Sequence, residues 1–243
     1  MTTSGTAAFN LSVLDIIEEA FERCGAESRS GYDVRTARRS LNLLTIEWAN
    51  RGINLWTITQ GAIPLYTGIS NYALPVDTID LLDQVVRTGS GQSQTDININ
   101  RISSSTYATI PNKNATGRPI QVWVDRQSDA IYPTTGQSTP QINVWPMPDQ
   151  GSVTSPYYMF VYWRLRRIQD SATGVNTQDI PFRFLNALVA GLAYYMAFKL
   201  PNVDPQRAMG LKAEYDAQLQ LAMEEDRDKA SDRFVPRIMG YGR

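Results

Sequence analysis

Carboxylates at helical spacing are the side chains of this sequence best suited to acid–base chemistry. Glu18 and Glu19 lie within four residues of Glu22, and Glu224 lies four residues before Asp228. A pair of carboxylates can serve as the acid and the base of a glycoside hydrolase. Asp and Glu on an exposed helix face are, however, far more often solvated charge than catalytic groups. A carboxylate-dependent enzyme that degrades the cell wall is therefore an alternative hypothesis only.

Other catalytic and cofactor chemistries lack the residues that they need. The sequence has no histidine, and Cys24 is its single cysteine, which excludes histidine-dependent nucleophiles, HExxH zinc sites and an internal disulfide. Neither GxxxxGKS/T nor GxGxxG occurs, so nucleotide binding has no support. Asp77, Asp80 and Asp83 are spaced like cation ligands, but the glycine and the distal glutamate of an EF-hand loop are missing. We predict no catalytic residue, no cofactor and no metal site, and hence a protein that is not an enzyme.

The overall charge argues against tight binding of nucleic acid. Lysine and arginine total 23 and aspartate and glutamate total 24, for a formal net charge of -1, whereas nucleic-acid binders carry a basic excess. Five aromatic residues in the middle of the chain could stack on bases or sugars, but few lysines surround them. We expect them to pack the core of a β domain and its interfaces, and a module that binds a glycan or nucleic acid stays an alternative. These residues are Trp123, Trp145, Tyr158, Tyr162 and Trp163.

A group of three cations, Arg35, Arg38 and Arg39, could contact a partner protein. The three arginines lie off the apolar stripe of the helix that we predict for this part of the chain. Because the stripe faces the core, the arginines form either a solvated basic face, which is the more common case, or a charged contact with another protein.

The end of the chain is a second candidate contact. From Arg233 onward it contains three arginines and no acidic residue. Disordered tails usually lack aromatic and branched apolar residues, and arginine and aromatic side chains are favoured anchors at interfaces. The segment therefore either folds back on its own domain or forms an arm that docks on another protein. Its candidate contact residues are Arg233, Phe234, Val235, Pro236, Arg237, Ile238, Met239, Tyr241 and Arg243.

The elements that must position these residues fall into three parts of the chain. Residues 10–52 predict two helices, since apolar residues recur every three or four positions, and the second helix should start at Asp33, a good N-cap. Residues 53–178 show short alternating runs between turn formers, which is typical of a β domain. Residues 179–230 return to helical spacing, with an N-cap at Asp204 before the last helix.

We expect an α+β fold. Neither helix pair carries enough apolar surface for a core of its own, so the helices of both chain ends should share one core. The expected architecture is a four-helix bundle formed from both chain ends, 10–52 and 179–230, with a small antiparallel β domain inserted at 53–178. Residues 231–243 form an extended C-terminal docking arm. The most apolar stretch, 184–200, is too short and too interrupted for a membrane span, so we expect no membrane contact.

Eight short motifs follow one another along nearly the whole chain. They are ARRSLN (37–42), WANRGINLW (48–56), YALP (72–75), DLLD (80–83), GRP (117–119), VWPMP (144–148), PFRF (181–184) and LAYY (192–195). Each motif is weakly specific, but their order resembles the head-to-tail adaptor family of short-tailed bacteriophages, also described as connectors or tail tubular protein A-like proteins.

The resemblance implies a structural virion protein at the tail-proximal vertex of the capsid, assembled in the host cytoplasm. Such adaptors form a twelve-subunit ring, a dodecamer, that joins the portal to the tail and lines the DNA ejection channel. Implied partners are other copies of the chain, the portal protein, a downstream nozzle or tube protein, and tail fibres. Residues 234–243 match the arm that reaches onto the portal. The near-neutral net charge fits a channel through which DNA passes without sequence-specific binding.

Overall fold

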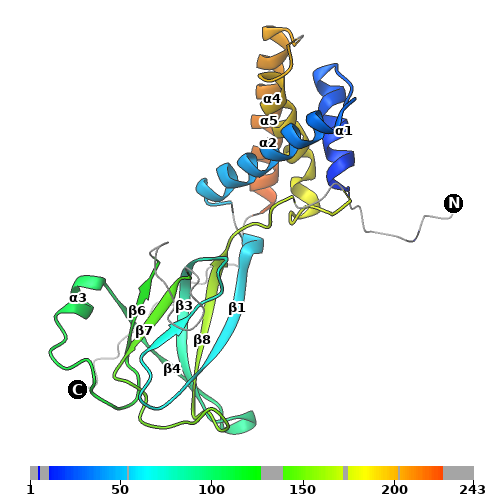
Figure 1. Cartoon of the computed structure of the whole chain (residues 1–243). Helices are drawn as coiled ribbons and strands as arrows, with labels where there is room; N and C mark the ends of the chain where they lie inside the picture. Colours follow the sequence, from blue (N-terminus) through cyan, green and yellow to red (C-terminus); the bar gives the residue numbers. More distant parts are fainter. Residues whose placement is uncertain are drawn as a thin grey trace, which may run out of the picture. The chain divides into compact units, whose positions relative to one another are not determined.

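The computed structural model describes residues 5, 11–53, 55–126, 139–171, 175–201 and 203–226. It separates the chain into two compact units: a helical unit, Met1–Leu44 with Ser171–Arg243, and a β unit, Thr45–Asp170. The described residues form five α-helices and two four-stranded sheets (Figure 1). The fold therefore belongs to the α+β class, as the sequence predicted.

The helical unit is built from helices of both ends of the chain. Its elements are α1 (Val13–Cys24), α2 (Gly31–Asn50) as far as Leu44, the short 3-10 turn η3 (Phe182–Phe184), α4 (Leu185–Ala197) and α5 (Pro205–Glu225).

Polar side chains fix where these helices begin. At α1, Asp15 N donates to Ser12 Oγ (3.2 Å) and Ser12 N donates to the Asp15 carboxylate (2.9 Å), which is a capping box. α2 begins at residue 31, before the predicted N-cap Asp33, because Ser30 and Asp33 bond in the same reciprocal way: Asp33 N donates to Ser30 Oγ (3.3 Å) and Ser30 N to Asp33 Oδ2 (3.1 Å). α5 begins after the predicted N-cap, Asp204.

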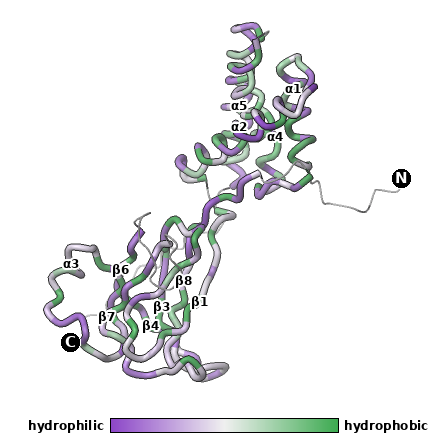
Figure 2. The backbone as a smooth tube through the Cα atoms, viewed as in Figure 1, coloured by the Kyte–Doolittle hydropathy of each residue, from purple (hydrophilic) through white to green (hydrophobic). Residues whose placement is uncertain are grey.

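α4 is the central helix of this unit, and its hydropathy can be followed in Figure 2. Most of its residues are buried, from Leu185 to Ala197. α1 and α5 both pack against it. A Cβ on Gly191 would lie 2.8 Å from Leu44 Cδ2 of α2 and 2.8 Å from Tyr215 Cε2 of α5. Only a residue without a side chain lets these neighbours approach α4 so closely.

The expected four-helix bundle is wrong. α1 and α5 pack along α4, but α2 runs across the other helices (Figure 1) and meets α4 through side chains such as Leu44. The apolar spacing of a helix shows which face is buried, but not the angle at which that face crosses its neighbours. The inserted β domain is also larger than expected, because the β unit contains two sheets. The expected arm, 231–243, lies outside the described residues.

The β unit consists of two four-stranded sheets with the strand orders β1-β8-β3-β4 and β2-β7-β6-β5. The strands are β1 (Ile58–Leu65), β2 (Asn71–Ala73), β3 (Thr78–Thr88), β4 (Thr95–Asn98), β5 (Asn100–Ile102), β6 (Gln121–Asp125), β7 (Gln141–Trp145) and β8 (Tyr158–Arg166). Three short helical segments, η1 (Leu55–Thr57), η2 (Gly91–Ser93) and α3 (Ser104–Ala108), lie in the same unit. The sheets are antiparallel except for the parallel pair β5 and β6, so the expected purely antiparallel domain needs that correction.

The first and last strands of the β unit are neighbours. β1 pairs antiparallel with β8 along its whole length, from Ile58 opposite Leu165 to Leu65 opposite Tyr158. β8 also pairs with β3 on its other side. The chain therefore enters and leaves this sheet through two adjacent strands.

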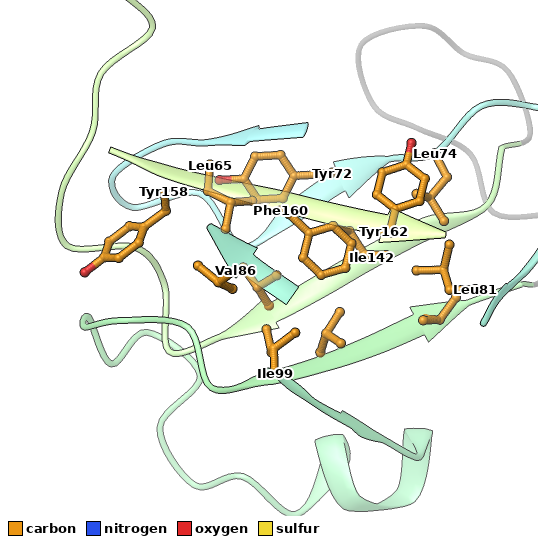
Figure 3. Close-up of a cluster of buried hydrophobic side chains, with 13 residues drawn as sticks. Leu65, Tyr72, Leu74, Leu81, Val86, Ile99, Ile142, Tyr158, Phe160 and Tyr162 are labelled. Carbon is orange, nitrogen blue, oxygen red and sulfur yellow. The ribbon is translucent and has the colours of Figure 1, made fainter. Parts of the chain in front are cut away.

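The core of the β unit contains side chains from both sheets (Figure 3). The cluster residues of β6, β7 and β8 lie at every second position, because successive side chains of a strand point to opposite faces. The cluster consists of Leu65, Tyr72, Leu74, Leu81, Val86, Ile99, Val122, Val124, Ile142, Val144, Tyr158, Phe160 and Tyr162.

Candidate partner-binding surfaces

α2 carries a basic depression on its surface. Tyr32, Arg35, Arg38, Arg39 and Asn42 line this depression, which has a volume of about 540 Å³. The helix brings these residues together because positions three and four apart share one face. The structure therefore places all three sequence-predicted arginines in one shallow site, and adds Tyr32 and Asn42, which sequence reasoning missed.

Two of the arginines of the basic depression bond only within their own helix. Arg35 Nε donates to Gly31 O (3.2 Å), and Arg39 Nη2 donates to Thr36 Oγ1 (3.3 Å). Within the described part of the chain, no carboxylate forms an ion pair with Arg35 or Arg39. Both side chains are exposed, so their charges face solvent in the isolated chain.

A second surface of the helical unit is acidic and lies on α1 and α4. We call it the acidic groove; its volume is about 630 Å³. It combines four carboxylates of α1 with apolar side chains of α4 and with Leu11, which lies two residues before α1. The lining residues are Leu11, Asp15, Glu18, Glu19, Glu22, Arg23, Leu185, Asn186 and Val189.

Arg23 links three helices beside the acidic groove through hydrogen bonds. Its guanidinium donates to Glu19 Oε1 (2.9 Å) on α1, to Glu214 Oε1 (2.9 Å) on α5 and to Asn186 Oδ1 (3.2 Å) on α4. Glu19 therefore has a structural partner. Glu18 and Glu22 are exposed, and the described residues offer neither of them a cationic partner.

One carboxylate of this surface, Asp15, does not have the pKa that a general acid needs. A general acid at neutral pH needs a raised pKa, whereas the hydrogen bond from the Ser12 side chain lowers the pKa of Asp15. The other predicted pair is incomplete here: Glu224 is exposed and accepts a bond from Gln220 Nε2 (3.2 Å), and Asp228 lies outside the described residues.

The single cysteine is also unsuited to catalysis. Cys24 is buried, and its Sγ donates to Ala193 O at 3.2 Å. Burial raises the pKa of the Cys24 thiol, which disfavours the reactive thiolate. The residue packs α1 against α4 instead.

Two of the aspartates spaced like cation ligands bind arginines. Asp77 Oδ1 accepts from Arg164 Nη1 at 2.6 Å. Asp80 accepts from Arg101 Nη2 (2.8 Å) and Arg126 Nη1 (2.9 Å). In the described part of the chain, no group of three His, Cys, Asp or Glu side chains is arranged to hold a metal ion. These contacts agree with the interpretation of the aspartates as strand and turn charges.

The aromatic residues of the β unit divide between its core and its outer surface. Tyr158 and Tyr162 are buried in the core, and burial raises the pKa of Tyr158 to about 12. Trp123 and Trp145 alternate with the core residues on their strands and are half-buried. Trp123 stacks on Tyr107 of α3 with ring centroids 5.0 Å apart, and Trp145 Nε1 donates to Asn112 O (2.9 Å). Trp123 thus packs against α3, and Trp145 bonds to the segment that follows α3, so both contact neighbouring segments of the β unit and are not part of its core cluster.

The predicted arm residues, Arg233 to Arg243, lie outside the described residues, so their role stays a prediction. None of the helices formed by the described residues has the length and apolar character needed to cross a membrane.

Comparison with known proteins gives one clear result. No match is found among curated proteins. The SU10 adaptor protein family, in contrast, matches residues 11–237, a stretch that contains both surfaces and reaches into the predicted arm. The narrower resemblance to the adaptors of short-tailed phages stays a prediction. Because the match covers most of the sequence, the chain belongs to the SU10 adaptor protein family.

Proposed function

We propose that this protein is a structural head-to-tail adaptor of a phage virion. In this proposal, copies of the chain form a ring, expected to have twelve subunits, that joins the portal to the tail and lines the DNA exit channel. The observation that carries the proposal is the match to the SU10 adaptor protein family over residues 11–237. The proposed location is the tail-proximal vertex of the capsid.

The parts of the chain have separate tasks in this proposal. The helical adaptor domain, 10–52 and 179–230, packs against the ring neighbours. The β-rich domain, 53–178, receives the downstream nozzle or tube protein and tail fibres. The C-terminal arm, 231–243, binds the portal. The net charge of -1 supports a channel that does not retain DNA.

The structural role is favoured over the enzymatic and glycan-binding alternatives. The predicted carboxylates lie on exposed helix faces, and Glu19 is held by Arg23. Trp123 and Trp145 are engaged with α3 and with the segment that follows it. No feature of the described residues favours turnover of a substrate or stacking on a sugar.

Sedimentation of the purified full-length chain, alone and after mixing with the portal ring of the same phage, tests the proposal. We expect a saturable complex with one adaptor chain per portal subunit. A correctly folded chain that does not associate with the portal ring at any ratio would contradict the proposal.

A further inference from the structure

Two surfaces of opposite charge lie on the helical unit, and the structure gives neither of them a covering segment among the described residues. The first is the α2 face, which we define as Tyr32, Arg35, Arg39 and Leu43. The second is the acidic groove of α1 and α4.

The α2 face combines exposed cations with exposed apolar area. Its four residues are spaced by three, four and four positions and therefore form one stripe. The relative exposure is 65% for Tyr32 and 54% for Leu43, which is high for large apolar side chains. Arg35 and Arg39 lie between them and bond only to their own helix. Tyrosine and arginine are enriched in the cores of protein interfaces.

The acidic groove has the complementary composition. Glu18 and Glu22 lie one helical turn apart on α1 and are exposed. Leu185 and Val189 of α4 form an apolar side of the same groove. Leu185 and Val189 are themselves buried, so the groove offers a partner its exposed carboxylates, which can pair with two guanidinium groups.

We infer that the α2 face of one copy docks in the acidic groove of the next copy, with Arg35 and Arg39 paired to Glu18 and Glu22. The two surfaces belong to the same chain and differ from each other, so the contact is heterologous, and repeating it generates a closed ring when the rotation closes. The inference rests on the proposed function, because it names the surfaces that join neighbours in the proposed ring. Charge complementarity of this kind fixes which surfaces meet and in which register.

Charge reversal of each surface in the full-length chain tests this pairing. One variant carries Arg35→Glu and Arg39→Glu, a second carries Glu18→Arg and Glu22→Arg, and a third carries all four changes. The measurement is the chain concentration at which half of the protein sediments as a ring on the portal ring of the same phage. We expect each two-site variant to need at least about tenfold more chain, because like charges then face each other.

The four-site variant should assemble nearly as well as the unchanged chain, because reversing both surfaces restores their complementarity. It should not enter mixed rings with the unchanged chain. A matched control variant with Arg29→Glu and Lys212→Glu changes the charge of the same unit by the same amount at exposed positions outside both surfaces. We expect this control to assemble normally, and circular dichroism confirms that each variant is folded.

The outcomes separate the inference from the proposed function. If the unchanged chain does not assemble on the portal ring, the proposed function fails and the inference fails with it. If the unchanged chain assembles and the two-site variants assemble like the control, only the inference is overturned. Loss of assembly that the four-site variant does not rescue also overturns the pairing. If the groove variant loses assembly while the α2 variant assembles like the control, the groove binds a portal segment and the inference is wrong.

Discussion

Asp77 and Arg164 show how a single ion pair couples the stability of the β unit to pH. Arg164 Nη1 donates to Asp77 Oδ1 at 2.6 Å and to Thr78 Oγ1 at 3.0 Å. Burial by itself raises the pKa of Asp77, but the hydrogen bonds and the positive charge of Arg164 outweigh it, so the pKa is lowered. A carboxyl group with a lowered pKa stabilises the fold above its unfolded pKa, and this contribution disappears as the pH falls through its folded pKa.

We therefore expect Asp77→Asn to lower the free energy of unfolding at pH 7 by about 0.5–1 kcal/mol, the range for a partly exposed pair. The difference from the unchanged chain should shrink as the pH falls through the lowered folded-state pKa of Asp77, because the carboxyl group is then protonated. Urea unfolding at a series of pH values measures this. Asp83→Asn is the matched control, because Asp83 is an exposed aspartate of β3, the strand that begins directly after Asp77. A constant difference between Asp77→Asn and the unchanged chain at all pH values would contradict the prediction.

At the scale of elements, Gly191 controls how closely α4 packs against α2 and α5. A Cβ at this position would lie 2.8 Å from Leu44 Cδ2 and 2.8 Å from Tyr215 Cε2. We expect Gly191→Val to destabilise the helical unit by about 1–3 kcal/mol, because extra atoms in a packed core force their neighbours apart.

Gly210 is the matched control for this prediction. It lies in α5, is exposed, and a Cβ there would meet nothing within 4 Å. Gly210→Ala should stabilise the chain by about 0.5–1 kcal/mol through helix propensity alone. Thermal unfolding followed by circular dichroism compares the two variants, and an equal or higher melting temperature for Gly191→Val would show that the helices do not pack as described.

The elements themselves were predictable from the sequence to a large extent, but their packing was not. The capping residue Asp204 and the apolar spacing of α1, α4 and α5 are local signals, and the structure agrees with them. The crossing of α2 over α4 depends on Gly191 and Leu44, which are far apart in the sequence, so no local pattern reveals it. The parallel pair β5 and β6 was missed for the same reason.

The candidate surfaces could likewise be predicted from the sequence only where they depend on a single helix. The three arginines of α2 were identified from helical spacing alone. The acidic groove was not, because its carboxylates come from α1 and its apolar side, Leu185 and Val189, comes from α4. A pattern within one helix cannot indicate which residues a second helix brings to its flank.

At the scale of the whole molecule, the predicted C-terminal arm is the part whose removal best separates folding from function. Deleting residues 233–243 should leave the melting temperature within about 1 °C of the unchanged chain and abolish association with the portal ring. This is expected because the deleted residues are proposed to bind the portal and not the core of their own chain. Calorimetry and co-sedimentation with the portal ring measure the two effects, and a truncated chain that misfolds would show that these residues belong to its own core.

The pairing of β1 with β8 has a consequence for the order in which the chain folds. In the unfolded chain, α1 is separated from α4 and α5 by the whole length of Thr45–Asp170. Once Ile58 lies opposite Leu165, only a short effective loop separates α1 from α4 and α5. The entropic cost of bringing these helices together is then much smaller than in the unfolded chain. Folding of the β unit therefore lowers the entropic cost of packing α1 against α4 and α5. During synthesis, α1 cannot bury its apolar face against α4 and α5 until these two helices, which follow β8, have left the ribosome.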